Sequence, residues 1–192
     1  MSSMLSKGFG AALLCFGLAA APAFAQTQLT ISASPNPSQV GQTIGLDVMI
    51  SNVQDLAAFQ FSLNFDPTLL QANSSSEGSF LSSAGSTVGD AGSIDNTTGI
   101  VSYAAYALTG MVPGANGSGV LIHMSFTALA AGTATLSFSD AILLNSSIND
   151  IAFTAQPANL TLVTVVPEPA SLGLMLAGLG FVAWRRRGAA AA

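Results

Sequence analysis

Between residues 56 and 67 the sequence reads Leu-Ala-Ala-Phe-Gln-Phe-Ser-Leu-Asn-Phe-Asp-Pro. From Phe59 to Phe65, large apolar side chains occupy every second position and polar side chains stand between them. This alternation predicts a half-buried β-strand, because successive side chains of a strand point to opposite faces. The Asp66-Pro67 pair ends the strand, since proline cannot donate a ladder hydrogen bond.

The same period of two recurs on both sides of this strand. Alternating stretches lie at residues 28–33, 41–50, 100–108, 120–126, 134–138 and 160–162. Clusters of Gly, Ser and Asn separate them, and the middle of the chain has no sustained helical period. We therefore expect an all-β sandwich. Residues 71–99, rich in Ser, Gly, Thr and Asn, are expected to add one or two short strands.

Charge is scarce and unevenly distributed along the 192 residues. Charged residues make up 7% of the chain, against about 25% in an average soluble domain. The four basic residues are Lys7 and residues 185–187, so residues 26–166 carry eight acids and no Lys or Arg. This composition argues against a nucleic-acid or anionic-lipid partner, because both need basic side chains. The only cysteine, Cys15, lies outside this middle region, which therefore has no disulfide or thiolate site.

Residues 1–25 have the pattern of a secretory signal peptide. Lys7 precedes an apolar run from residue 8 to residue 21, and Ala23 and Ala25 form a small-x-small cleavage pattern. Cleavage there makes Gln26 the first mature residue. The alternative is an uncleaved membrane anchor.

The C-terminal segment, residues 166–192, combines a short motif with an apolar run. Pro167, Glu168 and Pro169 precede apolar residues 172–184, and the run ends in Arg185, Arg186 and Arg187. The run is shorter than the roughly 20 residues of an ordinary spanning helix. We expect a transmembrane helix with its arginines on the cytoplasmic side.

This combination of motif, apolar run and arginines resembles the PEP-CTERM sorting signal of Gram-negative bacteria. The resemblance covers residues 166–187. It implies recognition by an exosortase in the inner membrane, removal of the tail, and delivery to the cell surface or an exopolysaccharide matrix. The alternative is a plain C-terminal anchor.

The order of strands between residues 28 and 165 resembles a cohesin domain. The matching stretches are Val40-Gly-Gln-Thr43, Ser51-Asn-Val53, residues 56–67 followed by Leu69-Leu70, residues 119–126, and Ala131-Gly-Thr133. The resemblance implies a jelly-roll sandwich of about nine strands, which we assign to residues 26–165. It also implies a dockerin module as the partner.

The sequence departs from the dockerin-binding pattern at two positions. Well-known dockerin binders carry an Asn and an Asp where this chain has Ala58 and Gln60. We therefore expect a cohesin-like fold whose partner is a dockerin-like or another protein. The expected binding face consists of Gln60, Ser62, Asn64 and Tyr106.

Two other non-catalytic functions remain open at this point. Tyr103 and Tyr106 lie on opposite faces of one predicted strand, so one of them could be an exposed platform for exopolysaccharide in a carbohydrate-binding module. Alternatively, the acidic, Ser- and Gly-rich surface serves only to hydrate a biofilm matrix, as in a structural matrix protein.

Catalysis is not expected, and neither is a cofactor. His123 is the only histidine and lies alone on a predicted strand, and no nucleophile or phosphate-binding motif accompanies it. Oxygen-bearing side chains at Asp140, Asn145, Asn149 and Asp150 could hold a calcium ion. Ordinary turn formation explains the same residues without an ion.

Overall fold

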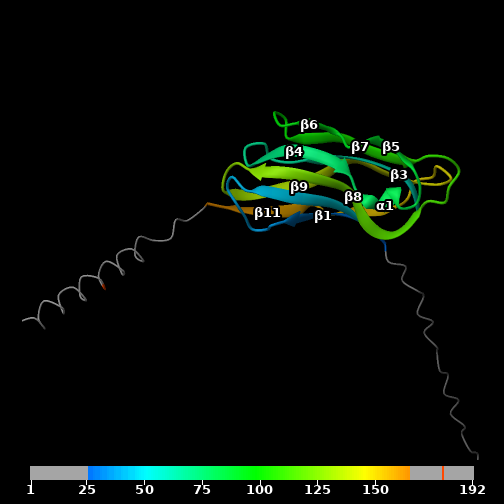
Figure 1. The fold of residues 1–192 in the computed structure, drawn as a ribbon, viewed down its shortest axis with the longest axis horizontal. Coiled ribbons are helices and arrows are strands. Elements are labelled where there is room, and N and C mark those ends of the chain that lie inside the picture. The colour runs from blue at the N-terminus through cyan, green and yellow to red at the C-terminus, as the bar shows by residue number, and fades with distance from the viewer. Residues whose placement is uncertain (1–25, 165–178, 180–192) are drawn as a thin grey trace, which may run out of the picture.

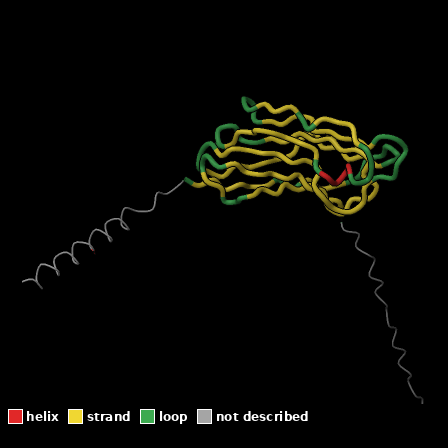
Figure 2. Tube along the Cα trace, in the orientation of Figure 1, coloured by secondary structure: helices red, strands yellow, loops and turns green. Residues whose placement is uncertain are grey.

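The computed structural model describes residues 26–164 and residue 179, and residues 26–164 form a two-layered β-sandwich (Figures 1 and 2). The elements in chain order are β1 (Thr27–Ser34), β2 (Ser38–Gln39), β3 (Thr43–Asn64), β4 (Leu70–Glu77), α1 (Ser79–Ser82), β5 (Thr87–Asp90), β6 (Ser93–Asp95), β7 (Ile100–Leu108), β8 (Ala115–Ala128), β9 (Gly132–Asn145), β10 (Phe153–Ala155) and β11 (Ala158–Val163).

Strand β3 belongs to both layers. Its first half pairs with β1 and β8, and its second half pairs with β7 and β9. Between the halves, Asn52 and Asp55 adopt positive φ angles of 56° and 60°, and the register with β8 shifts. Bulges of this kind bend a strand and increase its twist, which allows β3 to cross from one sheet to the other.

The crossing of β3 defines the two sheets. The first sheet has the order β10-β1-β3-β8-β4. The second has β7 beside β3, followed on the other side by β9, β11 and β2, while both β5 and β6 pair with the outer side of β7. The second sheet carries the candidate site.

The core lies between the sheets and contains the apolar positions of the alternating pattern. The buried residues of β3 are Ile44, Leu46, Val48, Ile50, Val53, Leu56, Phe59, Phe61 and Leu63. The ring of Phe61 meets Phe138 edge-on at 5.5 Å, and Phe65 meets Phe126 in the same way at 5.2 Å. Aromatic pairs favour this edge-to-face geometry.

The Ser-rich segment before β7 closes the side of the sandwich between β4 and β5. The Asn96 side chain accepts a hydrogen bond from the Ala72 amide at 2.8 Å and donates one to the Ala72 carbonyl at 2.9 Å. The Ser75 hydroxyl donates to the Ala91 carbonyl at 2.7 Å. These bonds satisfy part of the β4 edge, which would otherwise be open to pairing with another chain.

The expected all-β sandwich is confirmed. The described residues form eleven strands where about nine were expected, and three of the eleven, β2, β6 and β10, are only two or three residues long. The predicted signal peptide (1–25) and C-terminal transmembrane segment (166–192) lie outside the described residues, apart from residue 179. Within residues 26–164, no helix has the length and apolar character needed to cross a membrane.

Candidate functional site

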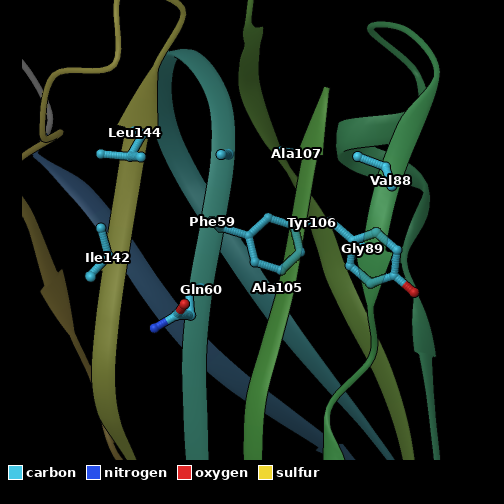
Figure 3. Close-up of a pocket in the computed structure, with 10 residues that line it drawn as sticks. Phe59, Gln60, Val88, Gly89, Ala105, Tyr106, Ala107, Ile142 and Leu144 are labelled. Carbon is cyan, nitrogen blue, oxygen red and sulfur yellow. The ribbon is translucent and has the colours of Figure 1, made fainter. Parts of the chain in front are cut away.

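The outer face of the second sheet is hollowed into a trough of about 390 Å³ (Figure 3). We call this feature the sheet trough. It crosses β9, β3, β7 and β5, and the residues that line it are Ala58, Phe59, Gln60, Val88, Gly89, Ala105, Tyr106, Ala107, Ile142 and Leu144.

Small side chains form the floor of the trough. Ala58 lies opposite Ala107 in the β3–β7 ladder, and Gln60 lies opposite Ala105. Directly opposite residues share a face of the sheet, so three alanines stand together on the outer side of the two central strands. Because an alanine side chain is one methyl group, the floor stays low.

Large apolar side chains form the two walls. On one side, β9 places Leu144 opposite Ala58 and Ile142 opposite Gln60. On the other, β5 places Val88 opposite Ala107. Ile142 is 45% exposed and Val88 is 62% exposed. Exposed apolar groups gathered around a hollow are typical of an interaction site.

Two of the four residues of the expected binding face are accessible on this outer surface. Gln60 stands in the trough and contributes its amide group (Figure 3). Asn64 lies further along the same face of β3, where its side-chain amide donates to the Ser139 hydroxyl at 3.0 Å. Asn64 is therefore tied to β9 within the sheet.

Ser62 departs from the expectation. Its side chain is completely buried, and its hydroxyl accepts a hydrogen bond from the Tyr103 amide at 3.1 Å. The β3–β7 register shifts between Phe61 and Leu63, and the β3–β9 register shifts between Gln60 and Ser62. The extra residues of these bulges lie on β7 and β9, so β3 keeps its alternation, with Phe61 and Leu63 in the core. Ser62 therefore shares the face of Gln60, but it is covered and is not available to a partner.

Tyr106 lines the trough but is partly buried. It lies opposite Phe59, whose side chain is buried in the core, and the two rings are 6.0 Å apart. Its ring passes beside Gly89, because a Cβ at that position would lie 2.7 Å from the Tyr106 Cδ1 atom. Burial, followed by the nearby carboxylates of Glu77 and Asp90, raises the pKa of Tyr106. Tyr106 thus packs with Phe59 against the core while it also lines the trough.

Tyr103 is the exposed tyrosine of this strand, with 60% of its surface accessible. It adopts a positive φ of 56° at the β3–β7 bulge. Positive φ is uncommon for a bulky residue, and bulges frequently redirect a side chain.

The walls of the trough were missed in the sequence, although a signal for them was present. Residues 141–144 read Ala-Ile-Leu-Leu without a polar residue. A strand with one solvated face alternates, whereas a continuous apolar run indicates that both faces meet apolar surroundings. The same reasoning applies to residues 104–108, Ala-Ala-Tyr-Ala-Leu.

The predicted calcium ligands do not form a described cluster. The Asn145 side-chain oxygen accepts hydrogen bonds from the amides of Ser147 and Asn149, at 3.0 and 2.9 Å, as in a turn. Asp140 lies at the β9 bulge with a φ of 49°. Among the residues that the structure describes, no group of three His, Cys, Asp or Glu is placed to hold a metal. The calcium site stays a prediction.

His123 lies away from the trough, on the first sheet. It is 2.6 Å from Asp47, which stands directly opposite on β3, and the two side chains are 50% and 42% exposed. An exposed pair of this kind contributes little to stability.

Comparison with known proteins identifies two parts of the chain. A family model described as the cohesin domain matches residues 27–156, and a model of the PEP-CTERM protein-sorting motif matches residues 165–187. No curated protein matches the chain.

Several solved structures share the fold. A type II cohesin from Acetivibrio cellulolyticus, crystallised in a cohesin–X–dockerin complex, is 20% identical with a TM-score of 0.61; the alignment covers 72% of this chain and 100% of that chain. A non-cellulosomal cohesin from the archaeon Archaeoglobus fulgidus is 14% identical with a TM-score of 0.55, covering 72% and 92%.

Proposed function

The chain belongs to the cohesin family, and from this we propose that it is an exported protein-binding module whose sheet trough receives an α-helix of a partner protein. The observation that carries the proposal is the trough itself, with its alanine floor between two apolar walls. Cohesin domains are non-catalytic protein-binding modules, which supports a role in binding.

The width of the trough supports a helical occupant. The walls stand on β9 and β5, three strand spacings apart, and neighbouring strands lie about 4.8 Å apart, so the walls are separated by roughly 14 Å. An α-helix with its side chains is about 10–12 Å across. The floor strands β3 and β7 already have neighbours on each side, so an extended strand could not pair within the trough and would find an open edge only at the outer side of β5.

The identity of the helix is part of the proposal. Cohesins that share this fold have been crystallised with dockerins, which makes a dockerin-like module one candidate. The presence of Ala58 and Gln60 in place of Asn and Asp favours a partner that relies on apolar contact, because Gln60 and Tyr106 are the only lining residues with polar side chains.

Export and sorting complete the proposal. The PEP-CTERM motif at residues 165–187 supports processing by an exosortase and display on the cell surface or in the surrounding matrix. The signal peptide at residues 1–25 would start this route.

The test is direct binding to residues 26–164, which contain both sheets and the whole described core. The probes are recombinant dockerin modules and a stapled helical peptide with one leucine stripe, measured by calorimetry. Ala105→Arg fills the floor and should reduce affinity at least about tenfold, because its long side chain takes the space of the helix. Gln60→Arg should also weaken binding.

Ser76→Arg is the matched control, because Ser76 is exposed on β4 of the other sheet. It adds the same charge and should leave affinity unchanged. Binding that is equally strong in Ala105→Arg would refute the trough as the site. Saturable binding of purified exopolysaccharide, with no binding of any helical probe, would favour a carbohydrate-binding module instead.

A further inference from the structure

We propose that the helix received by the sheet trough carries Lys or Arg on both sides of its apolar stripe, and that these side chains pair with Asp90 and Asp150. This inference rests on the proposed function and specifies the chemistry of the partner.

Asp90 stands at the β5 side of the trough. It lies opposite Ala105 in the β5–β7 ladder, so it shares the outer face with the floor alanines. It is exposed, and one carboxylate oxygen accepts a hydrogen bond from the Gly92 amide at 2.8 Å. That bond holds the carboxylate in place while solvent reaches it.

Asp150 stands at the β9 side. It forms an isolated bridge with Leu144, on the edge of β9 that faces away from β3. Because Leu144 is a wall residue on the outer face, its bridge partner lies beside the wall on the same face. Asp150 is also exposed.

The two carboxylates therefore bracket the trough across its width. From β5 to the segment of Asp150 there are four spacings, or roughly 19 Å. A helix of about 10–12 Å that lies between the walls leaves one carboxylate on each flank. Lys and Arg side chains can lay their apolar stems along the walls and extend their charges outward to meet them.

No basic side chain of the domain neutralises these carboxylates. Residues 26–164 contain no Lys or Arg. Within the described residues, the one ion pair is His123 with Asp47 on the other sheet. An apolar trough bordered by uncompensated negative charge attracts a helix with basic flanks and repels one with acidic flanks.

The test uses three stapled peptides that share one leucine stripe and differ only in flanking residues, which are all Lys, all Gln or all Glu. Affinities for residues 26–164 are measured at low and high salt. We expect the Lys-flanked peptide to bind more tightly than the Gln-flanked peptide, and the Gln-flanked peptide more tightly than the Glu-flanked peptide. Salt should narrow these differences, because exposed pairs are screened.

Three single variants separate local pairing from net charge. Asp90→Asn and Asp150→Asn should each weaken the Lys-flanked peptide about two- to fivefold and leave the Gln-flanked peptide unchanged. Asp47→Asn removes the same charge from the other sheet and should change neither affinity. An equal loss in all three variants would overturn the inference, since it would reflect overall charge alone.

The same data distinguish failure of this inference from failure of the proposed function. If the three peptides bind equally well and Ala105→Arg abolishes all binding, the trough is the site and the acidic flanks are irrelevant. If no peptide or dockerin binds the wild-type domain, the proposed function itself is wrong.

Discussion

At the residue scale, Ser62 maintains the distortion of the sheet that carries the trough. Its buried hydroxyl accepts the Tyr103 amide, which the bulge between Phe61 and Leu63 removes from regular ladder pairing. The hydroxyl of Ser62, in the middle of a strand, thus satisfies a backbone amide of the neighbouring strand. Tyr103 in turn reaches the surface with a positive φ.

We predict that Ser62→Ala lowers the free energy of unfolding by about 1 kcal/mol, because the Tyr103 amide loses its acceptor. Urea denaturation followed by circular dichroism measures this change. Ser125→Ala, on the outer side of β8, is the control and should be nearly neutral. A Ser62→Ala domain as stable as wild type would show that the hydrogen bond has no net effect.

A second residue-scale feature is a set of aspartates whose carboxylates cap turns. Hydrogen bonds from Ser146 and then Gly114 lower the pKa of Asp55, and bonds from the following threonines lower the pKa of Asp66 and Asp95, all from an ordinary value of 3.8. Asp55 thereby ties the loops before β8 and after β9 to the bend of β3.

These shifts predict the direction of the pH dependence. Since each pKa is lower in the folded state, the unfolded state binds protons more readily as the pH falls. The stabilisation is therefore fully present well above pH 3.8 and is lost as the pH falls below that value towards the folded pKa values. Thermal melts between pH 7 and pH 2.5 should show a falling Tm at the acid end, less steeply in Asp55→Asn. A constant Tm would contradict the prediction.

At the element scale, the trough depends on how closely β5 approaches β7. A Cβ at Gly89 would lie 2.1 Å from the Ala105 carbonyl oxygen and 2.7 Å from the Tyr106 ring. Only glycine permits this approach. It brings Val88 to the wall position opposite Ala107.

Gly89→Ala should therefore push β5 away from β7, lower the free energy of unfolding by about 1–3 kcal/mol through overpacking, and weaken binding of the helical probe. Gly45→Ala is the matched control, since the nearest atom to its added Cβ is the Ser34 carbonyl oxygen at 3.7 Å, an ordinary contact. Calorimetric melts and probe titrations of both variants test this. Equal stability and equal probe affinity of the two variants would mean that β5 accommodates the added Cβ without loss of stability.

At the scale of the whole molecule, the described chain enters and leaves the sandwich at opposite ends (Figure 1). β1 begins at Thr27, whose hydroxyl bonds the Asn52 carbonyl at the bend of β3. β11 ends at Val163, next to the start of β9 at Gly132. Along β9, the 13 steps from Gly132 to Asn145 span roughly 43 Å. The trough wall at Leu144 lies near the end where the chain enters.

Attachment through the C-terminal side should therefore present the trough away from the support. Immobilising residues 26–164 by residue 164 is expected to preserve the solution Kd and the full active fraction for the helical probe. Immobilising through residue 26 should reduce the active fraction, because it brings the loops with the exposed Met111 and Ile148 towards the surface. Biolayer interferometry compares the two, and the reverse order would contradict the proposed presentation.

Local pattern was sufficient for the class of fold and for much of the core. The alternation from Phe59 to Phe65 identified the inward side of the strand, and those aromatic residues are buried. Composition alone excluded thiol chemistry in residues 26–164 and argued against nucleic-acid binding, because both need side chains that this region lacks. The sorting motif could also be recognised in the sequence, because it is a short contiguous pattern.

The binding surface required tertiary structure. Gln60, Ala105 and Ile142 are neighbours only because strands far apart in sequence pair in one register. Periodicity reports which residues share a face of one strand, but it does not report what covers them. The bulges of β7 and β9 beside Ser62 depend on how those strands pair with β3. Strand pairing, crossing and bulging are non-local, so only the three-dimensional fold covered Ser62 and assembled the trough around Gln60.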